Sequence, residues 1–576
     1  MTYEQGDIPQ ANRPASRVSV TVALMVIIVI AAWIRSDQLT DRELWFDESC
    51  TFYAVNHLLD WPADGPDPQR ELAHIPYFFL LHAWTRLTGE TAWGLRSFSA
   101  LMGVLGVLAL GAIGHKLGGR RVALATAALA ALNPLHVYYS QEARVYTMWV
   151  VEMSLALLLL YQAARMQGLR WWIAYCVVVW ITVATHYYTL LWLPATATAA
   201  LIAKNRSRFA RQWLIAHVVL AVCLLPLAYL LIIPLAQGGP KMWLREMWLS
   251  YRPALAIPKS LWAMLPSGGY PSYLGSLTGA AEVAAGNLGQ AFGLVSLWGA
   301  TAVTAAVILT LTVTSQSGSV AKREGIHVVV SDSDDESTHR LQVALFLFGS
   351  VLAFLLFAFA YSLLAGPKYI VARYDLAAWP AITLGLAMLV DVLARRCHSG
   401  QLQRSAICAT ITAMLLACSM TTLAGARSVH PQNSATERAR RIASAVASDD
   451  LVISMAMYRW FMTYEWHQLE FRPHVVSFPQ AHDRQLCWDN PEAELADQES
   501  LAADIASVTE RIHRSFADGR RVWLLAHGDP TGPRWPVDSR FFAALHASGI
   551  DIQLHDEWAG LAQLTSRGQC EQPTTE

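Results

Sequence analysis

The sequence has little charge for its length. Only 15% of its 576 residues are charged, whereas soluble domains carry about 25%. The 43 Lys and Arg residues balance the 44 Asp and Glu residues, so the basic excess typical of nucleic-acid-binding proteins is missing and we expect no nucleic-acid partner. The eight cysteines include no Cys-x-x-Cys pair and no Cys/His ligand spacing, which argues against zinc and redox motifs.

The sequence is instead rich in long apolar runs. Hydrophobic residues make up 54% of the chain, and many of them are grouped in runs near the length that crosses hydrocarbon. We therefore predict a polytopic α-helical membrane protein with about eleven spans. The spans are expected at 18–35, 93–114, 122–137, 145–163, 171–186, 187–203, 211–235, 291–314, 341–364, 374–394 and 405–424. Because further spans follow the first run, we interpret it as an uncleaved span and not as a signal peptide.

Short basic loops predict the orientation of these spans. "HKLGGRR" at 115–121 and "KNRSRFAR" at 204–211 fall on the cytoplasmic side if residues 1–17 are cytoplasmic. The loop at 315–340 is then cytoplasmic as well, and we expect it to be flexible. The first outer loop, 36–92, contains an apolar stretch interrupted by two histidines and an arginine, which favours a helix lying in the membrane interface. The expected location is a bacterial-type inner (plasma) membrane.

The chain changes character after residue 425. "ATERARRIASAVASDD" and "AELADQESLAADIASVTERIHRSF" predict helices, while "LVISM" and "RRVWLLAHG" predict strands. This alternation predicts a small extracytoplasmic α/β domain over 426–576, separate from a transmembrane domain over 18–425. Cys487 and Cys570 lie in this domain, and whether they pair is left open.

Four polar clusters fall at the outer ends of the predicted spans. The first is the acidic pair in "LWFDESCTFYAV", Asp47 and Glu48. The others are "HVYYSQEARVY" at 136–146, "THYYT" at 185–189 and "GPKYIVARYD" at 366–375. Ionisable groups at membrane depth are candidates for function, so we expect these clusters to form one site.

Three cations in these clusters are unusual for an outer face. Arg144, Lys368 and Arg373 lie next to outer span ends, where the positive-inside bias disfavours basic residues. The planar fork of an arginine is well suited to a phosphate. The conjunction of carboxylates, cations and tyrosines favours a site for a lipid-linked phosphate.

Each cluster also has an ordinary interpretation. The acidic pair suits a solvated loop end, and interfacial tyrosines suit an aromatic belt. An outer arginine often extends to lipid head groups, and His186 alone suits a capped helix end. Only the conjunction of the four clusters at one face favours a functional site.

The same segments resemble a known family. "LWFDESCTFYAV", "AHIPYFFLLHAW", "GLRSFSALMGVLGV" and "ALNPLHVYYSQEARVYTM", in this order, are similar to membrane-embedded GT-C glycosyltransferases. The likeness is to bacterial relatives of protein O-mannosyltransferases and of the aminoarabinose transferase that modifies lipid A, a family 39-like group with an RgtA/B/C/D-like glycosyltransferase domain. It covers 18–190, and "KYIVARYDLAAWP" adds a later match.

The resemblance implies a GT-C fold and an inverting transfer of a sugar on the extracytoplasmic face, without a nucleotide cofactor. The donor would be a polyprenyl-phosphate sugar and the acceptor a glycolipid, glycan or protein, with membrane lipids as surroundings. Asp47 stands in the place of the family's acidic catalytic residue, where it would act as general base or metal ligand, and Glu48 would assist it.

A divalent metal ion is a candidate cofactor, with Asp47, Glu48 and His74 as its ligands. His74 lies in "AHIPYFF", where many relatives have His-Pro-Pro, and Glu142 would orient Arg144. The residues expected to hold the donor phosphate and the substrate are Arg144, Tyr139, Glu142, Tyr146, His186, Tyr187, Lys368, Arg373 and Tyr374.

Two functions of other classes compete with this one. A transporter or flippase for lipid-linked or small substrates places charges near the bilayer midplane, but Glu152 is the only clearly internal acid in the predicted spans. A sensor or assembly protein needs neither so many spans nor convergent outer charges. The sequence does not indicate which sugar or acceptor is used.

Overall fold

The structure is a computed structural model, and it describes residues 13–58, 74–237, 256–265, 332–364, 366, 371–397, 401–427, 434–456, 458–480, 495, 497–526, 530–531 and 536–567. The chain divides into two compact units. The helical unit comprises residues 1–37, 96–224 and 244–429, and the mixed unit comprises residues 38–95, 225–243 and 430–576. The mixed unit thus combines residues 38–95, the predicted first outer loop, with the C-terminal sheet, and the predicted domain boundary after residue 425 stays a prediction.

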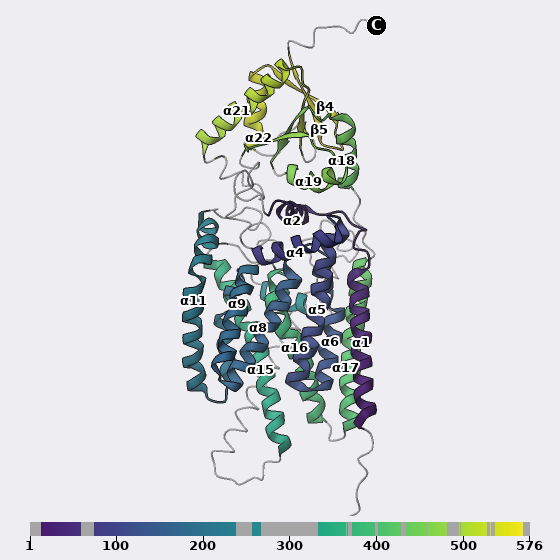
Figure 1. Cartoon of the computed structure of the whole chain (residues 1–576), viewed down its shortest axis with the longest axis vertical. Coiled ribbons are helices and arrows are strands. Elements are labelled where there is room, and N and C mark those ends of the chain that lie inside the picture. The colour runs from purple at the N-terminus through teal and green to yellow at the C-terminus, as the bar shows by residue number, and fades with distance from the viewer. Residues whose placement is uncertain are drawn as a thin grey trace, which may run out of the picture. The chain divides into compact units, whose positions relative to one another are not determined.

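The helical unit is built from long apolar helices that run side by side (Figure 1). The helices that belong wholly or mostly to it are α1 (Arg13–Ser36), α5 (Ala92–Gly118), α6 (Arg120–Leu132), α7 (Pro134–Ser140), α8 (Tyr146–Met166), α9 (Leu169–Thr185), α10 (Thr189–Trp192), the 3₁₀ helix η2 (Pro194–Leu201), α11 (Arg206–Gln237), α13 (Ala256–Met264), α15 (Asp332–Leu364), the 3₁₀ helix η5 (Tyr374–Ala377), α16 (Trp379–Cys397) and α17 (Gln401–Arg427).

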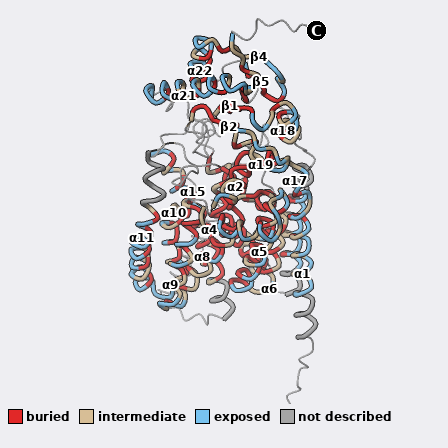
Figure 2. Tube along the Cα trace, turned by 45° about the horizontal axis from the view of Figure 1, so that its top comes forward, coloured by how far each residue is buried: buried red, intermediate tan, exposed pale blue. Residues whose placement is uncertain are grey.

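Burial differs sharply among these helices. α8 is mostly buried, whereas the described part of α11 is mostly exposed (Figure 2). The exposed apolar residues of α11 include Leu214, Val218 and Val222 at helical spacing. A contiguous exposed apolar face on a long helix is what hydrocarbon surroundings allow and water does not. α11 is therefore a helix whose outer face suits lipid.

Among the described residues, four helical segments are long and apolar enough to cross a membrane: Ala92–Gly118, Tyr146–Met166, Arg206–Ala228 and Thr338–Leu364. The bent pair α6 and α7 raises this number to as many as five. The predicted span at 291–314 lies outside the described residues, and the total of about eleven stays a prediction.

The bend between α6 and α7 is caused by Pro134 and is stabilised by hydrogen bonds from a residue of α1. The two helices meet at 59°, and Pro134 has no N–H to donate to the carbonyl of Ala130. The Arg35 guanidinium from α1 donates to Ala130 O at 3.0 Å and to Ala131 O at 2.8 Å. A side chain from another helix therefore satisfies the carbonyls that the break leaves open.

Two expectations about individual segments are corrected. Residues 187–203 do not form an α-helical span, because α10 has four residues and Pro194–Leu201 is a 3₁₀ helix in which Thr196 Oγ1 and Thr198 Oγ1 donate to carbonyls three residues back. The loop predicted to end at residue 340 ends earlier, since α15 begins at Asp332.

A buried ion cluster joins several helices at one end of the helical unit. Asp391 on α16 accepts from Arg340 Nη1 at 2.8 Å and from Arg395 Nε at 2.9 Å, and Arg121 Nη1 lies 3.8 Å away. Arg340 also donates to Gly118 O at 2.8 Å. The cluster thus ties together α5, α6, α15 and α16.

The mixed unit contains a five-stranded sheet with the order β2-β1-β3-β5-β4. β1, β2 and β3 are parallel, and β5 and β4 close the sheet as an antiparallel pair. Its elements are α2 (Phe46–Asn56), α4 (Ile75–Thr88), α18 (Ser434–Ala445), β1 (Leu451–Met455), α19 (Tyr458–Gln468), β2 (His474–Phe478), α21 (Gln498–Ala517), β3 (Val522–Leu525), α22 (Pro536–Ala547), β4 (Ile550–Asp556) and β5 (Leu561–Ser566). β1 and β3 lie where the sequence predicts strands.

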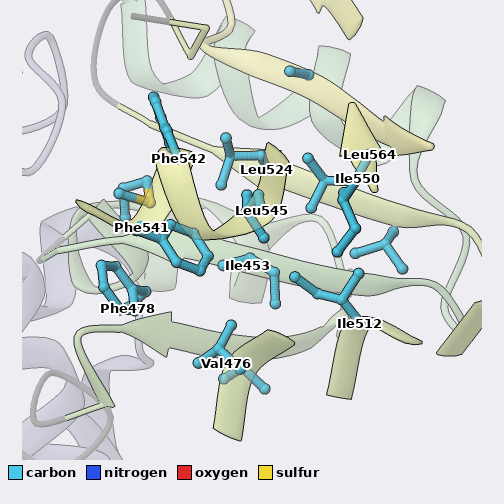
Figure 3. Close-up of a cluster of buried hydrophobic side chains, with 14 of the residues drawn as sticks. Ile453, Val476, Phe478, Ile512, Leu524, Phe541, Phe542, Leu545, Ile550 and Leu564 are labelled. Atoms are coloured by element: carbon cyan, nitrogen blue, oxygen red, sulfur yellow. The ribbon is translucent and has the colours of Figure 1, made fainter. Parts of the chain in front are cut away.

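Helices cover both faces of this sheet. On one face α21 and α22 bury Ile512, Phe541 and Leu545 against Ile453 and Leu524 (Figure 3). On the other face α18 and α19 form a second apolar cluster with the sheet. Successive side chains of a strand point to opposite faces of the sheet, which accounts for these two cores.

Candidate functional site

The helical unit brings three of the four predicted polar clusters together. They come from the α7–α8 segment, the end of α9 and the segment before α16, which are distant in sequence. We call the resulting group the aromatic cluster. It comprises Tyr139, Tyr146, Trp149, His186, Tyr187, Tyr188, Arg373 and Tyr374.

Arg373 is the cation at the centre of this group. Its side chain is 7% exposed, its Nε donates to the hydroxyl of Tyr146, and its Cζ lies 5.2 Å from the centroid of that ring. The neighbouring carbonyl of Ala372 accepts from Tyr139 OH at 2.9 Å. Two tyrosines that are seven residues apart therefore hold the Arg373 segment against α7 and α8.

His186 is fixed by stacking. Its ring lies parallel to Trp149, with centroids 4.0 Å apart and planes at 13°, and Tyr374 approaches from another side at 5.4 Å. Trp149 is held in turn, because its Nε1 donates to Thr189 Oγ1 at 2.8 Å. Tyr187 and Tyr374 are only half-buried, so the rigid interior of the cluster has a partly exposed rim.

Glu142 and Arg144 lie in the turn between α7 and α8. The Glu142 carboxylate is buried and accepts a hydrogen bond from Tyr138 OH, and the Arg144 backbone N–H donates to Glu142 O at 2.8 Å. Arg144 O accepts from Ser99 Oγ at 3.2 Å, and its side chain is half-buried. These contacts hold the turn, while the expected orienting of the Arg144 side chain by Glu142 stays a prediction.

Asp47 and Glu48 belong to the mixed unit, in the first turn of α2. Asp47 is 8% exposed and Glu48 is fully buried, which is not the solvated loop end of the ordinary interpretation. Trp45 N lies 3.4 Å from Glu48 Oε2, and Thr51 Oγ1 donates to Asp47 O at 2.9 Å. Carboxylates are favoured at a helix N-terminus, so α2 gives both acids a fixed place.

The metal site expected at Asp47, Glu48 and His74 stays a prediction. Within the ranges described above, no three His, Cys, Asp or Glu side chains are grouped as metal ligands. His74 precedes α4 as its N-cap residue, and its ring lies edge-on to Phe78 at 6.1 Å. His82 donates from Nδ1 to Val55 O at 2.8 Å, which ties α4 to α2. Lys368 lies outside the described residues.

Several residues of the site carry no clear signal in the sequence. Trp149 resembles an ordinary apolar side chain of a span, yet its ring stacks on His186. Tyr188 lies in the predicted cluster "THYYT" but is not one of the predicted site residues, and its ring contacts Tyr374. Asp375 accepts from Ala372 N and so holds the turn that contains Arg373. Asp375 is the last residue of the predicted cluster "GPKYIVARYD", and its position close to Arg373 in the sequence indicates a role beside it.

Comparisons with known proteins show what the chain and its fold are similar to. Residues 75–233 match the dolichyl-phosphate-mannose-protein mannosyltransferase family. No curated protein sequence matches the chain. Among solved structures, ArnT from Cupriavidus metallidurans bound to undecaprenyl phosphate aligns at TM-score 0.52 and 12% identity, covering 98% of this chain and 100% of that one.

Two further solved structures align less well. ArnT from the same organism in the apo state gives a TM-score of 0.45 at 14% identity, covering 96% of this chain and 99% of that one. The oligosaccharyltransferase AglB from Archaeoglobus fulgidus gives 0.44 at 11% identity, covering 97% of this chain and 75% of that one. The expected resemblance is confirmed: residues 75–233 match the mannosyltransferase family, and the chain as a whole has a fold similar to the GT-C membrane enzyme ArnT.

Proposed function

We propose that this protein is an integral membrane glycosyltransferase that uses a polyprenyl-phosphate-linked sugar. The observation that carries the proposal is the aromatic cluster, which surrounds a buried arginine with stacked rings. A guanidinium held in place suits a phosphate group, and aromatic faces suit a sugar ring or an isoprenoid chain. The similar ArnT structure holds undecaprenyl phosphate, which is a lipid of this class.

In the proposed reaction, Asp47 accepts the proton of an acceptor hydroxyl. The acceptor oxygen then forms a bond to the anomeric carbon as the bond from that carbon to the phosphate oxygen breaks. The electron pair leaves with the polyprenyl phosphate, and the configuration at the anomeric carbon inverts. Asp47 suits this role because α2 holds it in a mostly buried position.

Arg373 would neutralise the charge that grows on the departing phosphate. A cation fixed before the reaction stabilises that charge without the cost of reorganising water. Arg144, half-buried in the α7–α8 turn, would be a second phosphate contact, and Lys368 a third. Tyr139, Tyr146, His186, Tyr187 and Tyr374 would shape the donor site. Glu142 would support the turn through Tyr138.

Glu48 receives a supporting role in this proposal. Its carboxylate faces the backbone N–H of Trp45, so it stabilises the first turn of α2 next to Asp47. A divalent metal ion held by Asp47, Glu48 and His74 stays a prediction, and the proposed reaction includes no step on it. The acceptor, whether glycolipid, glycan or protein, would be modified on the extracytoplasmic face of the bacterial inner membrane.

The test is transfer from a synthetic undecaprenyl-phosphate sugar by the purified chain. The acceptor class would come from mass spectrometry of envelope glycans and glycolipids with and without the protein. Replacing the base, Asp47→Asn, should lower the transfer rate by about 10²- to 10⁴-fold. The matched control is Asp41→Asn, which changes an exposed aspartate of the same loop. Full transfer by the Asp47→Asn protein would remove Asp47 from the mechanism.

A further inference from the structure

The mixed unit contains a helix, α19, with two different apolar faces. Tyr458, Met462 and Trp466 recur every four residues and pack against the sheet. Trp460 and Tyr464 form a second stripe, offset by two residues, and Trp460 is 1% exposed without belonging to the sheet core. A helix with two buried stripes has a second partner.

That partner is α2, the helix that begins at the proposed catalytic acid. Phe52 on α2 contacts Tyr464 edge-on, with ring centroids 5.3 Å apart, and Tyr53 contacts Trp460 in the same way at 4.6 Å. Phe46 and Cys50 form a buried cluster with Trp460. Phe46 and Asp47 are adjacent, so this packing fixes the backbone next to the acid. Figure 1 shows α2 beside α19.

The segment before α2 is attached to the C-terminal part by a charged contact. The Glu43 carboxylate accepts from Ala435 N and Thr436 N, both at 2.8 Å. These amides belong to the first turn of α18, which has no partners for them within the helix. Glu43 thus acts as an N-cap from a distant segment, four residues before Asp47.

The end of the first outer loop is attached to α19 as well. Ala92 N donates to Tyr464 OH at 2.8 Å, and Gln468 Nε2 donates to Glu90 O at 3.2 Å. His467 Nε2 lies 3.4 Å from the Glu90 carboxylate. Residues before α2, on α2 and at the end of the loop therefore all contact α18 or α19.

We propose that the C-terminal α/β part positions the catalytic helix α2, with Glu43, Trp460 and Tyr464 as positioning residues. The inference rests on the proposed function, because it assigns these residues a role through Asp47. The apolar contacts set the rotation of α2, since Phe52 and Tyr53 occupy fixed aromatic neighbours. The Glu43 cap sets its start. Small displacements of a reacting group cost large factors in rate, so this attachment matters for catalysis and not only for folding.

The first test compares two tyrosines of α19. Tyr464→Phe keeps the ring on Phe52 but removes the hydroxyl that accepts from Ala92 N, whereas Tyr458→Phe removes a hydroxyl on the sheet side that accepts from Arg438. We expect kcat for sugar transfer to fall in Tyr464→Phe and to stay unchanged in Tyr458→Phe, with the donor KM the same in both. Equal kcat values for the two variants would overturn the inference.

The second test enlarges the effect and includes a rescue. Trp460→Ala should lower kcat by about 10²-fold at unchanged donor KM, and Trp460→Phe should restore most of the rate. In an Asp47→Asn background, Trp460→Ala should lower kcat little further, because both substitutions act through the Asp47 carboxylate. Full additivity of the two losses would mean that Trp460 does not act through Asp47.

A chemical probe reports the position of α2 independently of activity. Cys50 on α2 is buried against Trp460, so its thiol should react faster with a membrane-impermeant maleimide in Trp460→Ala and in Glu43→Ala. Glu437→Gln, at a half-buried acid of α18 that pairs with Arg441, is the matched control for Glu43 and should leave labelling unchanged. Peptide mass spectrometry identifies the labelled cysteine.

These outcomes separate the inference from the proposed function. If the wild-type chain transfers no sugar, the proposed function is wrong, and this inference with it. If the wild type transfers and Trp460→Ala transfers equally well, only the positioning role is wrong. Faster Cys50 labelling together with an unchanged kcat would also overturn the positioning role, because α2 would then move without consequence.

Discussion

The two ends of the helical unit bury charge in opposite ways. At one end a carboxylate, Asp391, is surrounded by the guanidinium groups of Arg121, Arg340 and Arg395. At the other end a guanidinium, Arg373, lies among aromatic rings and hydroxyl groups. The first arrangement joins four helices through strong mutual contacts. The second holds one cation among aromatic rings, and a guanidinium held in place suits the phosphate contact proposed for Arg373.

The comparison predicts that the two clusters fail differently when they are changed. The largest expected effect is on catalysis. Arg373→Ala should lower kcat/KM for transfer from an undecaprenyl-phosphate sugar by about 10²- to 10³-fold, because the departing phosphate loses a fixed cation. Arg373→Lys should recover part of the rate, since it keeps the charge without the fork. Steady-state kinetics on purified protein measure both.

Folding of the Arg373→Ala protein should change little by comparison. The aromatic rings around it keep their stacking, including the Trp149–His186 pair. Intact folding is checked by the thermal unfolding midpoint in detergent. A large fall in that midpoint with unchanged activity per folded molecule would contradict the expectation that Arg373 serves catalysis and not stability.

The next effect is on stability at the other end. Asp391→Ala leaves three arginines without their shared carboxylate and should destabilise the protein by about 3–5 kcal/mol, because removing one partner of a buried ion pair leaves uncompensated charge. Asp391→Asn should lie between the two proteins, since its amide oxygen still accepts. Unfolding in denaturant measures the difference, and transfer activity per folded molecule should be nearly normal.

The smallest effect concerns a carboxylate in the mixed unit. Burial pushes the pKa of Asp450 upward, but hydrogen bonds from Ala447 N, Trp523 Nε1 and Arg521 outweigh it and hold that pKa below its usual value. Because the folded pKa is the lower one, this stabilisation is fully present above the unfolded value of about 4 and is lost as pH falls through the folded pKa.

Asp450→Asn should therefore reduce stability at neutral pH and flatten its fall in acid. The expected change is small, since Arg521 is about half exposed and water screens its charge. Tryptophan fluorescence during acid titration is the measurement. Asp449→Asn, at the exposed neighbouring residue, is the control and should reproduce the wild-type curve.

Hydropathy and charge predict much of the helical unit, because a span is a long apolar run and its loops carry their charge at one side. The helical membrane class follows from such reasoning. The sequence also predicts that Tyr139, Tyr146 and His186 group near Arg373, since all four are expected at span ends on one face. The relation of Asp47 to these residues rests on family resemblance and stays a prediction.

Other features cannot be predicted from the sequence, because their residue patterns fit more than one structure. α19 reads poorly as an amphipathic helix, since one stripe faces the sheet and the other faces α2. β4 alternates weakly, because much of the strand is exposed at the sheet edge. The 3₁₀ helix at 194–201 is as apolar as a span, and only its proline and threonine hydroxyls distinguish it.

The repair of the α6–α7 break also has a consequence for the order in which the chain is assembled. Arg35 is near the N-terminus, so the ribosome makes it about a hundred residues before Pro134. When the bent pair enters the membrane, the guanidinium that satisfies its open carbonyls is already there. A rearranged gene that placed α1 last would insert the break before its partner existed, and the chain would have to hold an unsatisfied bend in lipid until synthesis ended.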